Sequence, residues 1–186
     1  MAIVFELWAE CHAEDDRDAL VEHVDGWEIV LATSGRTVRW DARPEPEPEF
    51  ALTATAAGLS TQGVRTLDDA VEATECGLRI YHRLLTAPDF RFVRAYWDAG
   101  TLHSDELHEY VDYEPLGERP RLSLSCVVED ALFRELGEPW SFEPFRDGYW
   151  WVRYRGETYR PLGSNDRPGL GELEQELFPR RLTWRA

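Results

Sequence analysis

The sequence contains no lysine, so all 20 of its basic residues are arginines. This absence excludes Schiff-base catalysis by a lysine amine, a pyridoxal phosphate anchor and the lysine of a phosphate-binding P-loop. The sequence also lacks a Gly-x-Ser-x-Gly nucleophile elbow and a paired-cysteine zinc pattern, and Gly169-Leu170-Gly171 lacks the third glycine of a dinucleotide-binding loop. We therefore expect no cofactor and favour a protein without catalysis, although arginine, histidine, glutamate and tyrosine suffice for acid–base chemistry.

Cysteine is scarce, and the three cysteines, Cys11, Cys76 and Cys126, are odd in number and far apart. That pattern does not resemble a disulfide framework. The first ten residues, MAIVFELWAE, have no basic segment and carry Glu6 within their apolar stretch, unlike a secretory signal peptide. No apolar run approaches the roughly 18 residues of a membrane span. We expect a soluble protein in the reducing cytoplasm, without a membrane partner.

The excess of negative charge is confined to the first two-thirds of the chain. Residues 1–118 hold 25 acidic residues and 9 arginines, whereas residues 119–186 hold 11 of each. An acidic surface disfavours the nucleic-acid backbone, which is bound by lysine and arginine, and it steers association toward basic partners. Genome composition or adaptation to high salt also accounts for an acidic chain without lysine, but a bias in genome composition should act on both parts of the sequence alike.

The spacing of apolar residues predicts the α+β class. In residues 1–100 the predicted strands are 2–11, 27–33, 37–41, 50–60 and 90–98, and the predicted helices begin at residue 14 and span 67–86. Thr66 and Asp69 have the spacing of a capping box at the start of the second helix. Apart from one extra hairpin strand, the order is β-α-β-β-α-β, the ferredoxin-like pattern of an antiparallel sheet with two helices on one face.

Residues 101–117 are predicted as a connecting helix, with Ser104 as its N-cap and Leu107, Tyr110 and Val111 facing inward. The neutral region 118–186, rich in arginine and aromatic residues, follows it. Its predicted elements are a strand 121–128, a helix 129–136, an extended segment 140–145, a hairpin of 149–154 with 157–162, a helix 168–177 and a strand 181–185. We predict that the ferredoxin-like order is repeated in this half; the alternative is one continuous domain.

An aromatic and arginine-rich stretch runs from Trp140 to Tyr159. Alternation along a strand divides the side chains of 149–154 between two faces: Tyr149, Trp151 and Arg153 on one, and Trp150, Val152 and Tyr154 on the other. If one face is core, the other shows aromatic rings near Arg155, a composition typical of protein interfaces and of surfaces that stack single-stranded bases. The alternative is a strand packed on both faces.

A second candidate surface is the acidic segment that starts the first helix, and it comprises Glu14, Asp15, Asp16, Asp18, Glu22 and Asp25. Such a face can match a basic protein, for example a toxin or nuclease, or imitate the phosphates of DNA. The alternative is an ordinary solvated surface.

Two histidine-containing segments are weaker candidates, and for both we favour a structural explanation. On a helix Asp105, His108 and Asp112 share a face, but His103 does not, so we expect no metal site. Adjacent strand residues point to opposite sides, so Cys11 and the residue after it, His12, are poorly placed as a catalytic pair; His23 or His82 would have to approach Cys11 instead.

The sequence therefore favours a cytoplasmic, non-catalytic protein-binding module, such as an immunity or inhibitor protein or an accessory subunit, whose partner has a basic surface. The predicted contact residues are Tyr149, Trp150, Trp151, Arg153, Tyr154, Arg155, Asp15, Asp16 and Asp18. One alternative is a small-molecule-binding or acid–base enzyme of the dimeric α+β type. Another is a binder of single-stranded nucleic acid that uses the C-terminal stretch.

Overall fold

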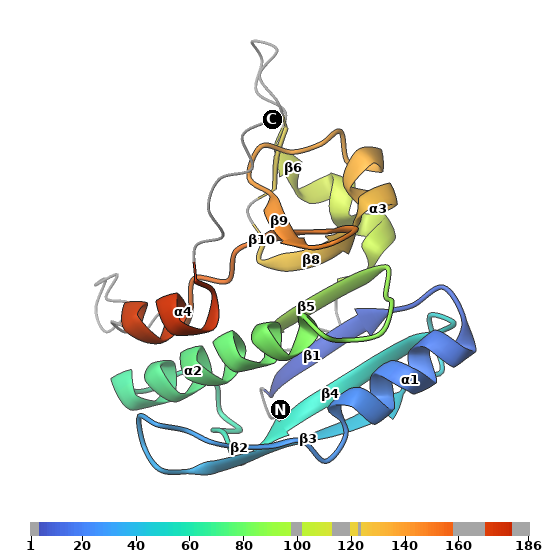
Figure 1. Ribbon diagram of the computed structural model, residues 1–186. Helices are drawn as coiled ribbons and strands as arrows, with labels where there is room; N and C mark the ends of the chain where they lie inside the picture. The colour runs from blue at the N-terminus through green and yellow to red at the C-terminus, as the bar shows by residue number, and fades with distance from the viewer. Residues whose placement is uncertain (1–3, 98–101, 113–119, 123, 158–169, 180–186) are drawn as a thin grey trace.

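The computed structural model describes residues 4–97, 102–112, 120–122, 124–157 and 170–179 (Figure 1). Its centre is an antiparallel sheet of eight strands in the order β2-β3-β4-β1-β5-β8-β10-β9. The strands are β1 (Phe5–Glu10), β2 (Glu28–Val30), β3 (Thr37–Pro44), β4 (Ala51–Ala57), β5 (Phe92–Trp97), β8 (Cys126–Glu129), β9 (Glu143–Arg146) and β10 (Tyr149–Val152). A separate pair is formed by β6 (Val111–Asp112) and β7 (Arg121–Leu122).

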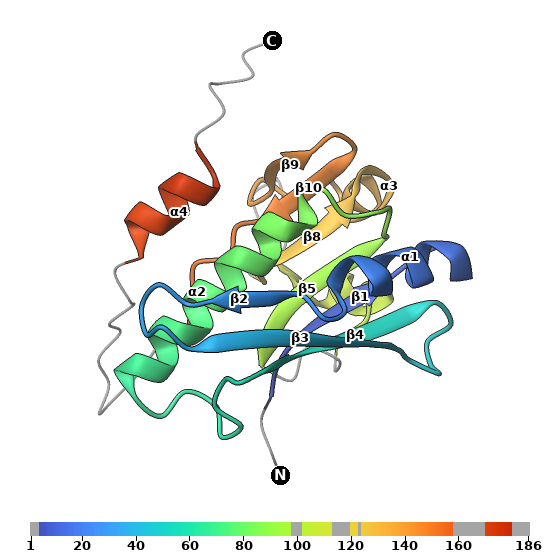
Figure 2. The same cartoon turned by 60° about the horizontal axis from the view of Figure 1, so that its bottom comes forward.

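Helices cover both faces of the large sheet. They are α1 (Glu14–Val24), α2 (Leu67–Leu84), the 3-10 helix η2 (Ser104–Tyr110), α3 (Asp130–Glu135) and α4 (Gly171–Leu177). Figures 1 and 2 show α1 and α2 on one face, α4 beside α2, and α3 next to β8 and β10. None of the helices in the described ranges is long and apolar enough to cross a membrane.

This architecture confirms the α+β class, but the ferredoxin-like arrangement predicted for residues 1–100 is not confirmed, because the sheet has eight strands in a longer order. The predicted repeat in the C-terminal half needs correction as well. β8 pairs with β5 through Phe92–Val128 and Val93–Val127, so the C-terminal strands extend the first sheet instead of building a second one. One sheet therefore runs across the boundary that we predicted at 101–117.

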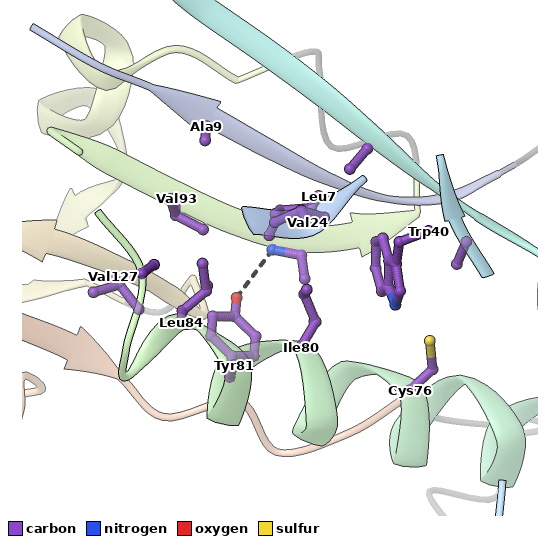
Figure 3. Packing of buried hydrophobic residues seen from close by; sticks show 14 of the residues in the cluster. Leu7, Ala9, Val24, Trp40, Cys76, Ile80, Tyr81, Leu84, Val93 and Val127 are labelled. Carbon is purple, nitrogen blue, oxygen red and sulfur yellow. Dashed lines mark hydrogen bonds between the residues drawn. The ribbon is translucent and has the colours of Figure 1, made fainter. Parts of the chain in front are cut away.

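The sheet separates two apolar cores, because successive side chains of a strand point to opposite faces. Leu7 and Ala9 of β1 face α1 and α2, whereas Trp8 faces the side covered by η2 and α3. Figure 3 shows the first core, in which Tyr81 of α2 lies against the sheet and its hydroxyl accepts a hydrogen bond from the backbone N–H of Ala95, at 3.0 Å.

Helix α2 follows its sequence signals closely. Thr66 Oγ1 accepts a hydrogen bond from the N–H of Asp69, and the Asp69 carboxylate accepts one from the N–H of Thr66, which confirms the predicted capping box. In the middle of the helix, however, Glu75 is fully buried. Its carboxylate fastens α2 to the turn between β2 and β3 by accepting hydrogen bonds from Ala32 and Thr33.

The predicted connecting helix is shorter than expected. Within residues 102–112, which the structure describes, only Ser104–Tyr110 is helical, as a 3-10 helix, and Val111 then pairs with Leu122 as a strand. Ser104 is its first residue and His103 its N-cap, while Tyr110 is exposed and not inward. Residues 113–117 lie outside the described part of the chain.

The segment 157–162, predicted as the hairpin partner of β10, is not the strand that pairs with it in the described part of the chain. Both edges of β10 are occupied, by β8 on one side and β9 on the other. Most of the segment predicted to pair with it, 158–162, lies outside the described residues, as does the predicted last strand, 181–185. The described end of this segment, Glu157, instead lies on α2, where its N–H donates to Thr74 Oγ1 at 2.9 Å.

Candidate functional site

The predicted aromatic contact face is part of the protein core. Tyr149, Trp151 and Tyr154 are only 8%, 3% and 2% exposed, and all three belong to the core beneath α2. Trp150 packs into the opposite core, stacked on Phe133 with ring centroids 4.3 Å apart. The strand is thus packed on both faces, and Tyr154 does not share the face of Trp150 because the strand ends at residue 152.

The two arginines of the predicted contact set differ in their surroundings. The Arg153 guanidinium donates to Glu143 at 2.6 Å and to Glu174 at 3.2 Å, so two carboxylates neutralise it. Arg155 is exposed. Because Arg153 is already paired, this region offers less free positive charge to a nucleic-acid backbone than its sequence indicates.

A different aromatic residue is exposed. Trp140 is 55% exposed and lies at a hollow of about 410 Å³ whose walls include Phe133, Phe142 and Trp150. The Arg121 guanidinium lies 5.4 Å from the centre of the Trp140 ring. Trp140 belongs to the aromatic stretch but not to the predicted contact residues, because the strand alternation that selected them covers only residues 149–154.

A larger and more polar hollow, of about 640 Å³, opens where β1 ends. We call it the acidic hollow, and its lining residues are Glu10, Cys11, Glu47, Pro48, Glu49, Arg91, His103, Ser104, Asp105 and Glu106. They come from the end of β1, the segment before β4, the residue before β5 and the first turn of η2. Five carboxylates thus surround one arginine, and this concentration of negative charge was not predicted as a site.

Glu10 is the most deeply buried carboxylate of the acidic hollow, with only 8% of the residue exposed. Its Oε1 accepts hydrogen bonds from the indole N–H of Trp8, at 3.2 Å, and from the backbone N–H of Ser104, at 3.0 Å. The Nδ1 of His103 lies 3.4 Å from the same oxygen. Its other oxygen, Oε2, accepts no hydrogen bond from any residue in the described ranges.

His103 stands beside Glu10 as a half-buried side chain. Its ring meets Trp8 edge to face, with centroids 5.4 Å apart. Although Nδ1 is close to Glu10, it is buried and forms no hydrogen bond with the described part of the chain. The backbone N–H of His103 donates to Glu106 Oε2 at 3.0 Å, which fixes the first turn of η2 at the wall of the acidic hollow.

The outer carboxylates of the acidic hollow are uncompensated. Glu47, Glu49 and Asp105 are exposed, and none forms an ion pair within the described residues. The one arginine of the lining, Arg91, lies 3.7 Å from Glu135 of α3. The electrostatic potential in the acidic hollow is therefore negative. At physiological salt, screening by ions makes this potential fall off over a distance of about 8 Å.

The predicted acidic start of α1 adjoins this hollow. Asp16 is close enough to Cys11 to raise the pKa of its thiol. Asp15 is exposed without an ion pair among the described residues, whereas Asp18 shares the Arg17 guanidinium with Glu14, at 2.8 and 2.9 Å. Figure 1 shows the start of α1 following directly on the end of β1. The start of α1 thus lies next to Cys11, one of the lining residues of the acidic hollow.

Cys11 is a buried thiol within this surface, and burial, assisted by Asp16, raises its pKa to about 12. The adjacent His12 pairs with Glu129 at 2.7 Å, and His23 bonds the carbonyl of Arg83 at 3.1 Å. These imidazoles therefore have partners other than the thiol. Within the described ranges, no three or more His, Cys, Asp or Glu side chains are placed to hold one metal ion.

Comparison with other proteins gives no further guidance. No protein-family model matches the chain, and no curated protein or solved structure shows significant similarity to it. The geometry alone therefore defines what the acidic hollow can do: it can bind a positively charged group by ion pairs and charge-assisted hydrogen bonds.

Proposed function

We propose that this protein is a non-catalytic binding module that engages a basic partner protein through the acidic hollow and the adjoining start of α1. The observation that carries the proposal is the convergence of five carboxylates and one arginine around one hollow. An immunity or inhibitor protein and an accessory subunit of a larger assembly both fit this role, and the cytoplasm is the expected compartment.

The main contribution of these carboxylates is to association. Exposed ion pairs add only about 0–1 kcal/mol each, but a surface of one sign raises the association rate of an oppositely charged partner by a factor on the order of 10–1,000. Repulsion among Glu47, Glu49 and Asp105 is relieved when a basic surface covers them. A partner of this kind would bind more weakly as salt increases.

An apolar anchor lies close to the acidic hollow. Arg91, in its wall, contacts Glu135 of α3, and Phe133 of the same helix lines the hollow at Trp140. Interfaces combine a few buried aromatic anchors with a polar rim, and tryptophan is enriched among the anchors. The proposed surface therefore extends over α3 to Trp140, which takes the role of aromatic anchor predicted for Tyr149 and Trp151.

The proposal is tested with an octa-arginine peptide as a probe of basic partners. The triple variant Glu47→Gln, Glu49→Gln, Asp105→Asn removes three exposed charges from the acidic hollow. Its control, Glu28→Gln, Glu172→Gln, Glu176→Gln, removes three exposed charges from β2 and α4, away from the proposed surface, so both variants have the same net charge.

Binding is measured by isothermal titration calorimetry at 50 and 300 mM NaCl. We expect the acidic-hollow variant to bind about tenfold more weakly at 50 mM, which corresponds to about 1.4 kcal/mol, and the control to bind within about twofold of the unmodified protein. If both variants bind the peptide more weakly by the same factor, the affinity depends on the net charge of the protein alone. That result would overturn the proposal.

A further inference from the structure

Resting on the proposed function, we propose that the hollow at Trp140 binds a quaternary ammonium group, namely the trimethylated lysine side chain of a basic partner. We call this site the aromatic hollow. Its aromatic lining residues are Phe133, Trp140, Phe142 and Trp150, and its charged lining residues are Asp130, Arg134 and Glu138. The proposal gives this second hollow a ligand of its own, whereas the acidic hollow attracts basic surfaces in general.

The first observation is that four aromatic side chains from separate parts of the chain meet at this hollow. Phe133 lies on α3, Trp140 and Phe142 follow that helix, and Trp150 lies on β10. Phe133 stacks on Trp150 and meets Phe142 edge to face, with ring centroids 4.3 and 5.5 Å apart. The face of an aromatic ring is electrostatically negative, so several rings around one space attract a cation.

The second observation concerns Trp140, whose backbone is fixed although 55% of the residue is exposed. Its N–H donates to the carbonyl of Pro120 at 3.0 Å. Two residues earlier, the N–H of Glu138 bonds the carbonyl of Phe133 at 3.1 Å and closes the end of α3. A binding group whose backbone is already fixed loses less conformational freedom when a ligand binds.

The ring of Trp140 also has a cation beside it in the protein itself. The guanidinium of Arg121 lies 5.4 Å from the ring centre, within the range of cation–π attraction. Arg121 is not among the residues that line the aromatic hollow. The indole thus attracts positive charge in this setting, and the hollow itself holds no part of that arginine.

Charge complementarity favours a cation in the aromatic hollow. Asp130 and Glu138 contribute two carboxylates to the lining, against the one guanidinium of Arg134. Arg134 pairs with Asp130 at 2.6 Å, so these two charges offset each other. Glu138 is exposed and forms no ion pair within the described residues, so its carboxylate gives the lining a net negative charge.

The lining fits a quaternary ammonium better than the ammonium of unmodified lysine. Asp130 already accepts hydrogen bonds from the Trp150 indole, at 3.1 Å, and is paired with Arg134, which leaves Glu138 as the free carboxylate. A lysine ammonium is strongly hydrated and has three N–H donors, which aromatic walls do not satisfy. Methylation of lysine keeps the charge, and trimethylation removes all three donors, so the group loses less on leaving water.

The position of the aromatic hollow indicates that this group comes from a protein partner. Phe133 of α3 lines the aromatic hollow, and Glu135 of the same helix contacts Arg91 in the wall of the acidic hollow. A basic partner bound at the acidic hollow therefore lies close to the aromatic hollow. One lysine of that partner can enter while its backbone stays at the surface.

The experiment adds the peptide amide Gly-Gly-Lys-Gly-Gly to the ¹⁵N-labelled full chain in three forms: with its lysine trimethylated, unmodified, or replaced by the uncharged tert-butyl isostere of trimethyl-lysine. We expect saturable shifts of the indole N–H signals of Trp140 and Trp150 with the trimethylated peptide, and binding about fivefold weaker for the other two. If the isostere binds equally well, the hollow is only apolar; if unmodified lysine does, methylation is not recognised. Either result overturns the inference.

Free choline is titrated in parallel, because it carries the same trimethylammonium group without a peptide. It should bind more weakly than the trimethylated peptide, whose backbone also contacts the surface around the aromatic hollow. Choline that binds as tightly as the peptide would make the ligand a small molecule, and it would overturn the assignment to a partner side chain.

The variant Trp140→Leu keeps an apolar side chain and removes the exposed ring. We expect it to bind the trimethylated peptide about tenfold more weakly. The control Tyr96→Leu removes another exposed aromatic ring beside an arginine, since the Arg94 guanidinium lies 4.6 Å from the centre of the Tyr96 ring. Tyr96 is not a lining residue of the aromatic hollow, so this variant should bind the trimethylated peptide like the unmodified protein.

The outcomes separate the two proposals. If Trp140→Leu binds the trimethylated peptide normally while the exposed-charge triple variant still weakens octa-arginine binding, the quaternary ammonium site is refuted and the proposed function stands. If the triple variant binds octa-arginine like its control while the trimethylated peptide binds selectively through Trp140, the proposed function is refuted and the site stands. If Trp140→Leu proves unfolded by its amide spectrum, the comparison of the three peptides on the unmodified chain decides the matter.

Discussion

Replacing Glu75 by glutamine should destabilise the fold by several kilocalories per mole. Oε1 of this fully buried carboxylate accepts hydrogen bonds from the N–H of Ala32 and from Arg79, both at 2.8 Å. Oε2 accepts from the N–H of Thr33, at 3.0 Å, and from its hydroxyl, at 2.8 Å. Each carboxylate oxygen therefore serves two donors, and Glu75→Gln replaces one oxygen by an NH₂ group that can accept from neither.

The magnitude follows from the donors left unpaired. If the glutamine oxygen stays toward Ala32 and Arg79, the Thr33 hydroxyl can rotate to accept from the new NH₂ group, but the Thr33 N–H loses its acceptor. An orphaned buried donor costs about 1–3 kcal/mol, and hydrogen bonds to a charged group are worth more than those to a neutral one. We expect a loss of about 2–4 kcal/mol in the free energy of unfolding at pH 7.

The pH dependence gives a second signature of the same interaction. Burial alone raises the pKa of the Glu75 carboxyl, but the hydrogen bonds from Ala32, Thr33 and Arg79 outweigh it, so the pKa lies below its ordinary value. A carboxyl whose pKa is lower in the folded state stabilises the protein above its unfolded pKa of about 4.3, and this contribution is lost as pH falls through the folded pKa. The difference between the unmodified protein and Glu75→Gln should therefore shrink below about pH 4.3.

The assay is equilibrium unfolding in urea, followed by the fluorescence of the eight tryptophans, at pH 7 and at pH 3.5. The control is Glu28→Gln, an exposed carboxylate on β2, which should change stability by less than about 0.5 kcal/mol. A cost below about 1 kcal/mol for Glu75→Gln at pH 7, or a difference that does not shrink with acid, would refute the reasoning.

Three further predictions test the core and the acidic surface. Trp151→Ala should lower the free energy of unfolding by about 3–5 kcal/mol in chemical denaturation, and a loss below about 1 kcal/mol would mean that the side chain is exposed. Gly77→Ala should destabilise by about 1–3 kcal/mol, because the new Cβ would clash with the ring of Tyr154, and an unchanged melting temperature would contradict that contact. Burial lowers the pKa of His23, so part of the stability should be lost as pH falls below about 6.5, and His23→Gln should lack this loss in urea titrations at pH 7.5 and 5.5.

Local sequence signals predicted most of the secondary structure in the first 97 residues. The alternating apolar residues of β1, the turn between β2 and β3 and the capping box of α2 each depend on neighbours in the chain, and all three are present. The C-terminal elements were predicted less well. A run such as 149–154 has the pattern of a strand, but nothing local states which strands lie on either side of it.

The candidate site illustrates the same limit. Glu10 appeared in the sequence as one acid before a cysteine, and Glu47 and Glu49 as part of a proline-rich segment. They lie around one hollow only because β1 pairs with β4 and β5, which places the segment before β4 and the residue before β5 beside the end of β1. Pairings between distant segments depend on the sheet as a whole. No local sequence motif therefore predicts the acidic hollow.

By itself the sequence determined the class of fold, the absence of lysine chemistry and the uneven distribution of charge, since composition and local periodicity need no knowledge of distant contacts. Only the tertiary structure decided which aromatic residues are core and which acids are buried. Trp151 is enclosed because the sheet is covered on both faces, and Trp140 is left exposed at the edge of α3. The physical reason is that burial depends on what packs against a residue from elsewhere in the chain, and a residue's type sets only the free energy that this burial gains or costs.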